Sequence, residues 1–263
     1  MVVERGTCMH LTIHLRPYAT PFAIPIHYNY YLQAAIYEGL SKEVGGFFHD
    51  TGFEYEGRKL KLFTFSRLLG KSTLDREKGE FSFSGDVTFI VSSPIKQFCS
   101  SLATGFLKLG SVRIASVPFS VTAVEVAEPQ ATGTSLLVRA MSPVTVYSTM
   151  TKYDGSKYTC YFDPREPEFQ RLILSNLAKK YQVLTQEEPP QTPPFRIVPK
   201  GVPKLSIVDY KGTVVKGYSC LFLLEGPPQL LQIALDAGLG AKNSQGFGCI
   251  IPEQPVPAKT VHI

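Results

Sequence analysis

The sequence of 263 residues lacks any apolar run that approaches 18 residues, the length that a membrane-spanning helix needs. It also lacks an uninterrupted signal-peptide core near its start, where charged and histidine side chains break the apolar pattern. These interrupting residues are Glu4, Arg5, His10, His14 and Arg16. The sequence therefore predicts no membrane association, and we expect a soluble protein of the cytoplasm.

Cysteine is scarce, and the five cysteines are odd in number, widely spaced and free of any Cys-x-x-Cys pair. They are Cys8, Cys99, Cys160, Cys220 and Cys249. This pattern argues against a disulfide framework and a thiolate metal site, and it indicates reduced thiols. His10 and His14 face the same side of a predicted strand, but no carboxylate or thiol accompanies them. We therefore predict neither a metal site nor a cofactor.

Common enzyme motifs are missing or incomplete. The serine-hydrolase pattern Gly-x-Ser-x-Gly does not occur. The stretch Gly70-Lys71-Ser72-Thr73 resembles the end of a Walker phosphate loop, but Phe65 stands where the first glycine belongs. A dinucleotide fingerprint would need a third glycine at Asn243, and it would follow a strand rather than a helix. The sequence thus argues against a serine hydrolase and against these two nucleotide sites.

Four glycines within eleven residues make 238–248 the most distinctive segment, and a cation and two hydrogen-bonding side chains stand among them. The residues are Gly238, Gly240, Lys242, Asn243, Ser244, Gly246 and Gly248. Glycines let backbone amides approach a ligand closely, and such loops suit anionic ligands. The alternative is a packing role, in which the glycines let a helix approach the strand that follows it.

The 27 basic and 22 acidic residues give a net charge of +5, which is compatible with a polyanionic partner but does not require one. Positive charge is concentrated in two acid-free stretches. The first holds Arg58, Lys59, Lys61, Arg67 and Lys71, and the second holds Arg196, Lys200 and Lys204. Each stretch could follow a phosphate backbone or could simply be solvated.

The order of predicted elements repeats along the chain. Alternating and helical periodicity predict strands at 9–15, 61–66, 81–92 and 111–126, and helices at 30–43 and 94–109. This βαββαβ order is that of a ferredoxin-like domain, in which two helices cover one face of an antiparallel sheet.

The second half has the same order, with helices at 166–182 and 228–237 and an inserted hairpin around Asp154-Gly155. We predict an α+β protein of two tandem ferredoxin-like, RRM-like domains with antiparallel sheets. The expected domains are residues 1–128 and 133–263, the second of which contains the glycine-rich segment.

The tandem ferredoxin-like order and the pattern Gly-x-Gly-x5-Gly-x-Gly resemble the CRISPR-associated endoribonucleases of the RAMP superfamily, which cut repeat RNA into guide RNAs. The resemblance also extends to the first half of the chain, at residues 26–37, 48–50 and 61–66. It implies a reaction that needs no metal ion, in which a ribose 2′-hydroxyl attacks the adjacent phosphorus. The products are a 2′,3′-cyclic phosphate and a 5′-hydroxyl.

The resemblance assigns catalytic roles to three residues. The family's histidine after the first helix corresponds to His49, its tyrosine on that helix to Tyr37, and its lysine before the Leu-Phe-Thr strand to Lys61. The chemistry needs a base, an acid and a charge stabiliser, and histidine exchanges protons near neutral pH. Which of His49 and Tyr37 is the base stays open, and Lys59 or Arg58 could replace Lys61.

RNA binding is expected from Arg58, Lys59 and Arg67 and from the seven glycine-segment residues named above. His27 is a reserve proton donor. Asp50 is adjacent to His49, but neighbouring side chains usually point apart, so no orienting role is expected.

The expected partner is CRISPR repeat RNA (pre-crRNA), and membership of an effector complex and formation of a homodimer are both open. The alternative function is a non-catalytic subunit that binds repeat or guide RNA. A third interpretation is a small-molecule enzyme that holds a phosphate in the glycine-rich segment.

Overall fold

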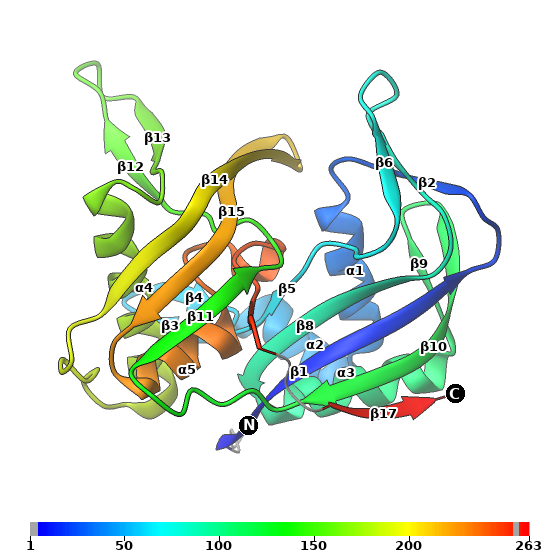
Figure 1. The fold of residues 1–263 in the computed structure, drawn as a ribbon, viewed down its shortest axis with the longest axis horizontal. Coiled ribbons are helices and arrows are strands. Elements are labelled where there is room, and N and C mark those ends of the chain that lie inside the picture. The colour runs from blue at the N-terminus through cyan, green and yellow to red at the C-terminus, as the bar shows by residue number, and fades with distance from the viewer. Residues whose placement is uncertain (1–4, 255–257, 263) are drawn as a thin grey trace.

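Two antiparallel sheets lie side by side in the computed structural model, which describes residues 5–254 and 258–262 (Figure 1). Each sheet has helices packed on one face, and each has its own apolar core. No helix in the described ranges is both long and apolar enough to cross a membrane.

The first sheet has the strand order of a ferredoxin-like fold. Four of its six strands are β1 (Arg5–Pro17), β5 (Thr64–Phe65), β8 (Val87–Ile95) and β10 (Val117–Ala127), in the order β10-β1-β8-β5. The helices α1 (Asn29–Gly39) and α3 (Lys96–Leu109) pack on it. Leu11, Ile13 and Leu15 alternate along β1 and are fully buried, as the period of a strand requires.

The second sheet repeats this arrangement. It contains β11 (Ser135–Ala140), β14 (Arg196–Tyr210), β15 (Thr213–Glu225) and β16 (Ile250–Pro252), in the order β14-β15-β11-β16. Its helices are α4 (Pro167–Thr185) and α5 (Pro228–Ala237). The predicted hairpin is present as β12 (Tyr147–Thr151) and β13 (Lys157–Tyr161). The prediction of two tandem ferredoxin-like folds with antiparallel sheets is therefore confirmed.

The last strand of the chain returns to the first sheet. β17 (Ala258–His262) pairs antiparallel with β10, and Figure 1 shows it along the outer edge. The sequence does not predict this pairing. The predicted domain boundaries remain predictions, and they include residues 1–4, 255–257 and 263, which lie outside the described residues.

The helix predicted at 30–43 is broken into α1 and α2 (Lys42–Gly46). Leu40 is extended, and the Ser41 side chain accepts a hydrogen bond of 3.4 Å from the Val44 N–H, which caps a new helix. Close packing fixes the end of α1 here, because a Cβ atom on Gly105 would lie 1.8 Å from the Gly39 carbonyl oxygen.

Two predicted strands are likewise divided. The stretch 81–92 forms β7 (Glu80–Phe83) and β8, and β7 leaves the sheet to pair with β2 (Phe22–Pro25) and β6 (Ser72–Asp75). The stretch 111–126 forms β9 (Ser111–Ile114) and β10, because Ala115 adopts a positive φ of 53° at a turn. Alternation alone does not show where such a run turns.

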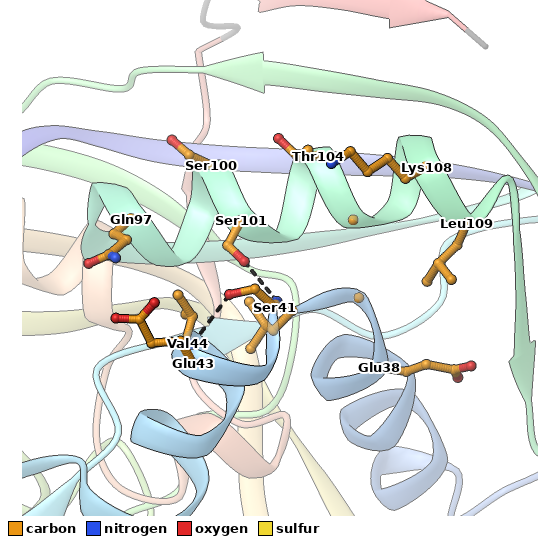
Figure 2. A pocket seen from close by; sticks show the side chains of 13 residues that line it. Glu38, Ser41, Glu43, Val44, Gln97, Ser100, Ser101, Thr104, Lys108 and Leu109 are labelled. Carbon is orange, nitrogen blue, oxygen red and sulfur yellow. Dashed lines mark hydrogen bonds between the residues drawn. The ribbon is translucent and has the colours of Figure 1, made fainter.

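A groove of about 610 Å³ lies between α3 and the break between α1 and α2 (Figure 2). The Ser41 N–H donates a hydrogen bond of 2.9 Å to Ser101 Oγ across it. Glu38 and Glu43 stand at its border. This hydrogen bond connects the break between α1 and α2 to α3. The turn that follows α2 carries His49.

Candidate active site

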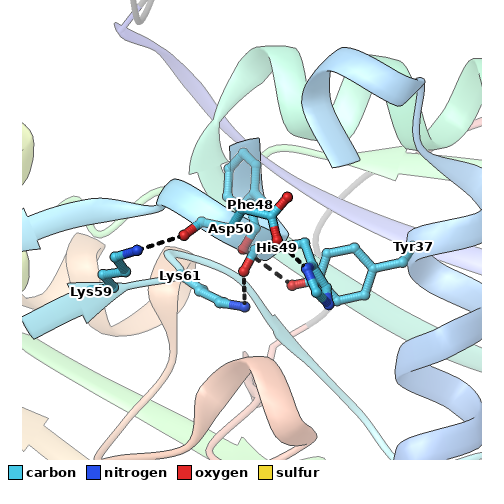
Figure 3. A network of polar contacts seen from close by, with 6 residues as sticks. All are labelled: Tyr37, Phe48, His49, Asp50, Lys59 and Lys61. Carbon is cyan, nitrogen blue, oxygen red and sulfur yellow. Dashed lines mark hydrogen bonds and ion pairs between the residues drawn. The ribbon is translucent and has the colours of Figure 1, made fainter. Parts of the chain in front are cut away.

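Tyr37, His49 and Lys61 lie together on the surface of the first domain (Figure 3). The ring centroids of Tyr37 and His49 are 5.6 Å apart, and the ring planes are inclined at 80°. Lys61 Nζ lies 5.9 Å from the Tyr37 ring centroid and donates a hydrogen bond of 2.7 Å to the His49 carbonyl oxygen. The structure thus brings the three predicted catalytic residues into one cluster.

A single π-helical turn, Phe47–Thr51, carries His49. Phe48 in this turn is fully buried, and its ring centroid lies 4.7 Å from that of Phe98. Such turns hold an extra residue compared with an α-helical turn and are frequent at functional sites. Because Phe48 is fixed in the core, the next two side chains, His49 and Asp50, are exposed.

The Nδ1 atom of His49 lies 2.6 Å from Oδ1 of Asp50. The expectation that these neighbours point apart is wrong, because the π-helical turn holds both on the same side. Mainly through this hydrogen bond, the pKa of Asp50 is below its usual range. A carboxylate at Nδ1 leaves Nε2 of His49 as the ring nitrogen that can exchange a proton with a substrate.

The hairpin of β3 (Phe53–Tyr55) and β4 (Arg58–Leu60) positions the neighbouring cations. Lys59 Nζ donates a hydrogen bond of 2.7 Å to the Asp50 carbonyl oxygen, and Lys61 directly follows β4. Lys59 and Lys61 therefore both contact the turn that carries His49. Arg58 instead lines a separate hollow.

Two groups of the cluster have shifted pKa values. Burial, with smaller contributions from Tyr210 and Asp50, raises the pKa of Tyr37 to about 12, so its phenol stays protonated at neutral pH. Burial lowers the pKa of Lys61, and the Asp50 carboxylate partly offsets this effect. The Tyr37 hydroxyl donates a hydrogen bond of 3.3 Å to the Phe48 carbonyl oxygen.

The glycine-rich segment is packed inside the protein rather than spread on its surface. Its four glycines are buried, and all have φ between 67° and 86°. A Cβ atom on Gly248 would lie 1.9 Å from the Leu239 carbonyl oxygen, and one on Gly240 would lie 2.4 Å from that of Thr145. Packing therefore requires these glycines, and Lys242 is among the segment's partly exposed residues.

A buried lysine that is not among the predicted site residues holds this segment. Lys180 Nζ donates hydrogen bonds of 2.6 Å to the Gly238 carbonyl oxygen and 2.8 Å to Asn243 Oδ1. The Asn243 Nδ2 group donates to the carbonyl oxygens of Leu239 and Phe247, at 2.9 Å and 3.0 Å. Asn243 is thereby engaged within the segment.

The sequence did contain a signal for Lys180. Phe169, Ile173 and Leu177 form the buried face of α4, and Lys180 continues it by helical spacing. A lysine on an apolar face needs buried partners. Burial lowers the pKa of Lys180 to about 7.

The glycine-rich segment is attached to the helix that carries Tyr37. Asn29 Nδ2 donates a hydrogen bond of 2.9 Å to the Gln245 carbonyl oxygen, and Gln33 Nε2 donates to that of Ser244. Residues four apart on a helix lie on one face, so Asn29 and Gln33 share a face of α1 with Tyr37. The second domain therefore helps to set the position of Tyr37.

Two other predicted residues form hydrogen bonds with the second half of the chain. Arg67 follows β5 whereas Lys61 precedes it, and the Arg67 N–H donates a hydrogen bond of 3.0 Å to the Met141 carbonyl oxygen. His27 Nδ1 accepts a hydrogen bond of 3.1 Å from the Asp209 N–H.

The two histidines of β1 have separate partners. His10 is buried with Nε2 at 3.1 Å from the Leu235 carbonyl oxygen, and His14 Nε2 lies 3.1 Å from Glu125 Oε1. Within residues 5–254 and 258–262, no three His, Cys, Asp or Glu residues group as ligands for a metal ion.

Two family models match adjacent parts of the chain. "CRISPR-associated protein Cas6, N-terminal" matches residues 23–125, and "CRISPR associated protein Cas6, C-terminal" matches residues 126–251. The CRISPR-associated endoribonuclease Cas6 1 of Methanocaldococcus jannaschii is 26% identical over 234 residues, which are 87% of each chain. The CRISPR-associated endoribonuclease Cas6 of Pyrococcus furiosus is 26% identical over 235 residues, 87% of this chain and 83% of that one.

A solved structure of a Cas6-related gene product of Pyrococcus furiosus has the same fold. Its TM-score is 0.82 at 22% identity, and the match covers 94% of this chain and 100% of that one. A RAMP protein described as binding different RNA substrates matches with a TM-score of 0.80 at 19% identity and the same coverage. Because the two Cas6 models together match residues 23–251, the chain belongs to the Cas6 family.

Proposed function

We propose that this chain is an endoribonuclease that cuts CRISPR repeat RNA without a metal ion. The observation that carries the proposal is the cluster of Tyr37, His49 and Lys61, with Asp50 hydrogen-bonded to the imidazole. This cluster offers a proton acceptor, a proton donor and a cation, which are the groups that the reaction needs. Two relatives named as CRISPR-associated endoribonucleases support the same activity.

His49 is the proposed base. With Nδ1 hydrogen-bonded to Asp50, Nε2 takes the proton of the ribose 2′-hydroxyl as the 2′ oxygen forms its bond to phosphorus. Tyr37 cannot share this role at neutral pH, because a phenol with a pKa of about 12 stays protonated.

Tyr37 is the proposed acid. Its phenol is still more acidic than an alcohol, so it can give its proton to the 5′ oxygen as the bond between phosphorus and that oxygen breaks. The products are a 2′,3′-cyclic phosphate and a 5′-hydroxyl. The Lys61 ammonium, 5.9 Å from the Tyr37 ring centroid, stabilises the negative charge on the non-bridging phosphate oxygens.

RNA binding follows from the cations beside this cluster. Lys59 lies at the His49 turn, Arg58 lies on the same hairpin, and Lys242 is partly exposed in the glycine-rich segment. Contacts between such cations and phosphates release counterions, so binding should weaken steeply as salt is raised. Arg67 stays a predicted RNA contact, and the buried glycines of the segment contribute indirectly, because their packing fixes the loop that carries Lys242.

The test is incubation of the purified protein with repeat RNA from its own genome in excess EDTA. We expect cleavage at one position, a cyclic phosphate on the product, and no cleavage when that position carries a 2′-deoxy sugar. His49→Ala should abolish cleavage and retain binding. Tight binding without cleavage by the unchanged protein would instead establish the non-catalytic RNA-binding subunit.

A further inference from the structure

A hollow of about 570 Å³ lies between the β3–β4 hairpin, α4 and the start of β12. Residues that line it include Tyr55, Arg58, Tyr147, Ser175, Asn176 and Lys179. Its volume falls within the range of about 300 to 1,000 Å³ that is common for small-molecule sites. None of Tyr37, His49 and Lys61 lines it, so its chemistry needs a separate explanation.

The charge of this hollow favours an anionic group. Arg58 of the hairpin and Lys179 of α4 line it, and no carboxylate is among its lining residues in the described part of the chain. The half-buried Lys242 adds a third cation nearby, with Nζ at 5.5 Å from the Tyr147 ring centroid. The groove beside α3 differs, since carboxylates such as Glu38 border it. Cations without acids concentrate anions such as phosphate.

One residue of the wall has an unpaired hydrogen-bond acceptor. The Oδ1 atom of Asn176 is shielded from solvent and has no hydrogen-bond partner among the described residues. A buried acceptor left unpaired costs free energy, so the Asn176 side chain would be stabilised by turning its Oδ1 toward a donor on a ligand. The exocyclic amino group of a nucleobase is such a donor, and the Tyr147 ring, which also lines the hollow, offers a surface for stacking.

The hollow and the catalytic cluster lie on opposite sides of one short strand. Side chains alternate along a strand, so Arg58 and Leu60 line the hollow whereas Lys59 and Lys61 contact the His49 turn. A single-stranded RNA that crosses β4 would therefore present one phosphate to His49 and a neighbouring nucleotide to the hollow.

We propose that this hollow binds one unpaired nucleotide of the RNA, next to the cleaved phosphate. Its phosphate lies between Arg58 and Lys179, and its base stacks on Tyr147 and donates a hydrogen bond to Asn176. The inference rests on the proposed function, because the ligand is a part of the RNA that is cut.

The test uses repeat RNA with a 2′-deoxy sugar at the cut and single abasic substitutions at successive positions around it. Binding is measured for the unchanged protein and for Ser175→Phe, which fills the hollow. We expect one abasic position to weaken binding by the unchanged protein about tenfold, as loss of a stacked base does. Ser175→Phe should bind intact RNA about tenfold more weakly and be insensitive to that same abasic position.

Two matched variants control this experiment. Ser100→Phe makes the same change at an exposed position of α3 and should bind as the unchanged protein does. Arg58→Ala should weaken binding and reduce its salt slope by about one, whereas Arg76→Ala on the exposed β6–β7 turn should do neither. Circular dichroism and melting of each variant show whether it is folded, and Arg58→Ala tests the hollow without crowding it.

Equal abasic penalties in the unchanged protein and in Ser175→Phe at every position would overturn the proposal, even if the RNA is cut as expected. If the unchanged protein neither binds nor cuts repeat RNA, the proposed function and this inference both fail. A third arm adds free nucleoside monophosphates. These nucleotides could raise the melting temperature of the unchanged protein but not of Ser175→Phe, while both proteins bind RNA equally well. In that case the hollow binds a free nucleotide instead of the RNA.

Discussion

The Nδ1 atom of His49 and Oδ1 of Asp50 lie 2.6 Å apart, although 69% and 74% of the two side chains are exposed. An exposed ion pair contributes little to folding stability. The value of this pair therefore lies in orientation, because a carboxylate at Nδ1 fixes which ring nitrogen faces a substrate. In the proposed reaction, Asp50 is a positioning residue.

Replacing Asp50 by alanine should lower kcat roughly tenfold and leave KM nearly unchanged. This loss is smaller than the 10²- to 10⁴-fold that is typical for removal of the acid or base itself. Asp50→Asn should restore part of the rate, because its amide oxygen can still accept from Nδ1. Cleavage of repeat RNA at increasing concentrations measures the rate for both Asp50 variants. Asp154→Ala in the exposed hairpin turn is the control.

Tyr37→Phe should lower the cleavage rate by about 10²-fold or more, since it removes the proposed proton donor and keeps the ring. RNA affinity and melting temperature should stay close to those of the unchanged protein, because within residues 5–254 and 258–262 the hydroxyl makes a single long hydrogen bond, of 3.3 Å, to a carbonyl oxygen. An unchanged rate in Tyr37→Phe would assign the acid to another group.

The alkaline limit of activity should belong to Lys61. Burial lowers the pKa of its ammonium, so its charge is lost at a lower pH than for an ordinary lysine, and the rate should fall as pH rises through that value. Tyr37, with a pKa of about 12, stays protonated over the same range. Lys61→Arg stays charged and should move the alkaline fall to higher pH. The measurement is the cleavage rate of both proteins against pH, corrected for uncatalysed RNA hydrolysis, which shows whether the alkaline fall has moved.

Lys180→Met should destabilise the fold by about 3 kcal/mol, because it leaves Asn243 Oδ1 and the Gly238 carbonyl oxygen without their donor. Such a loss lowers the melting temperature by roughly 10 °C in a protein of this size. Lys179→Met changes the neighbouring, partly exposed lysine and should have a small effect. Similar melting temperatures for the two variants would refute the role given to Lys180.

His10 should make the protein sensitive to acid. Burial lowers its pKa from 6.5 to about 4, so between these values the unfolded chain binds a proton that the folded chain does not. Folding stability should therefore fall as pH drops from 6.5 to 4, by roughly 3 kcal/mol from this residue. His10→Gln keeps a donor for the Leu235 carbonyl oxygen and should flatten the curve of melting temperature against pH over this interval.

The regular elements could be predicted because periodicity is a local property. The strand at 9–15 and the helix at 228–237 are present within β1 and as α5. The breaks at Ser41 and Ala115 were missed, since each depends on a cap, a turn or a close approach that periodicity does not record.

Within the candidate site, the resemblance supplied His49, Tyr37 and Lys61, and the structure places them together. The sequence did not yield the contact between His49 and Asp50, because it depends on a π-helical turn that no sequence pattern specifies. The burial of Lys180 could have been predicted from the sequence, since this lysine interrupts the apolar face of the helix that forms α4.

The return of β17 to β10 limits how the protein can move. Five residue pairs join these strands, from Ala123 and His262 to Ala127 and Ala258, and β10 belongs to the first sheet. The chain leaves the first sheet after β10 and returns to it at β17. The second half is therefore connected to the first sheet at both of its ends. We therefore expect this pairing to restrict separation of the two halves, so that bound RNA is accommodated mainly by loops and side chains.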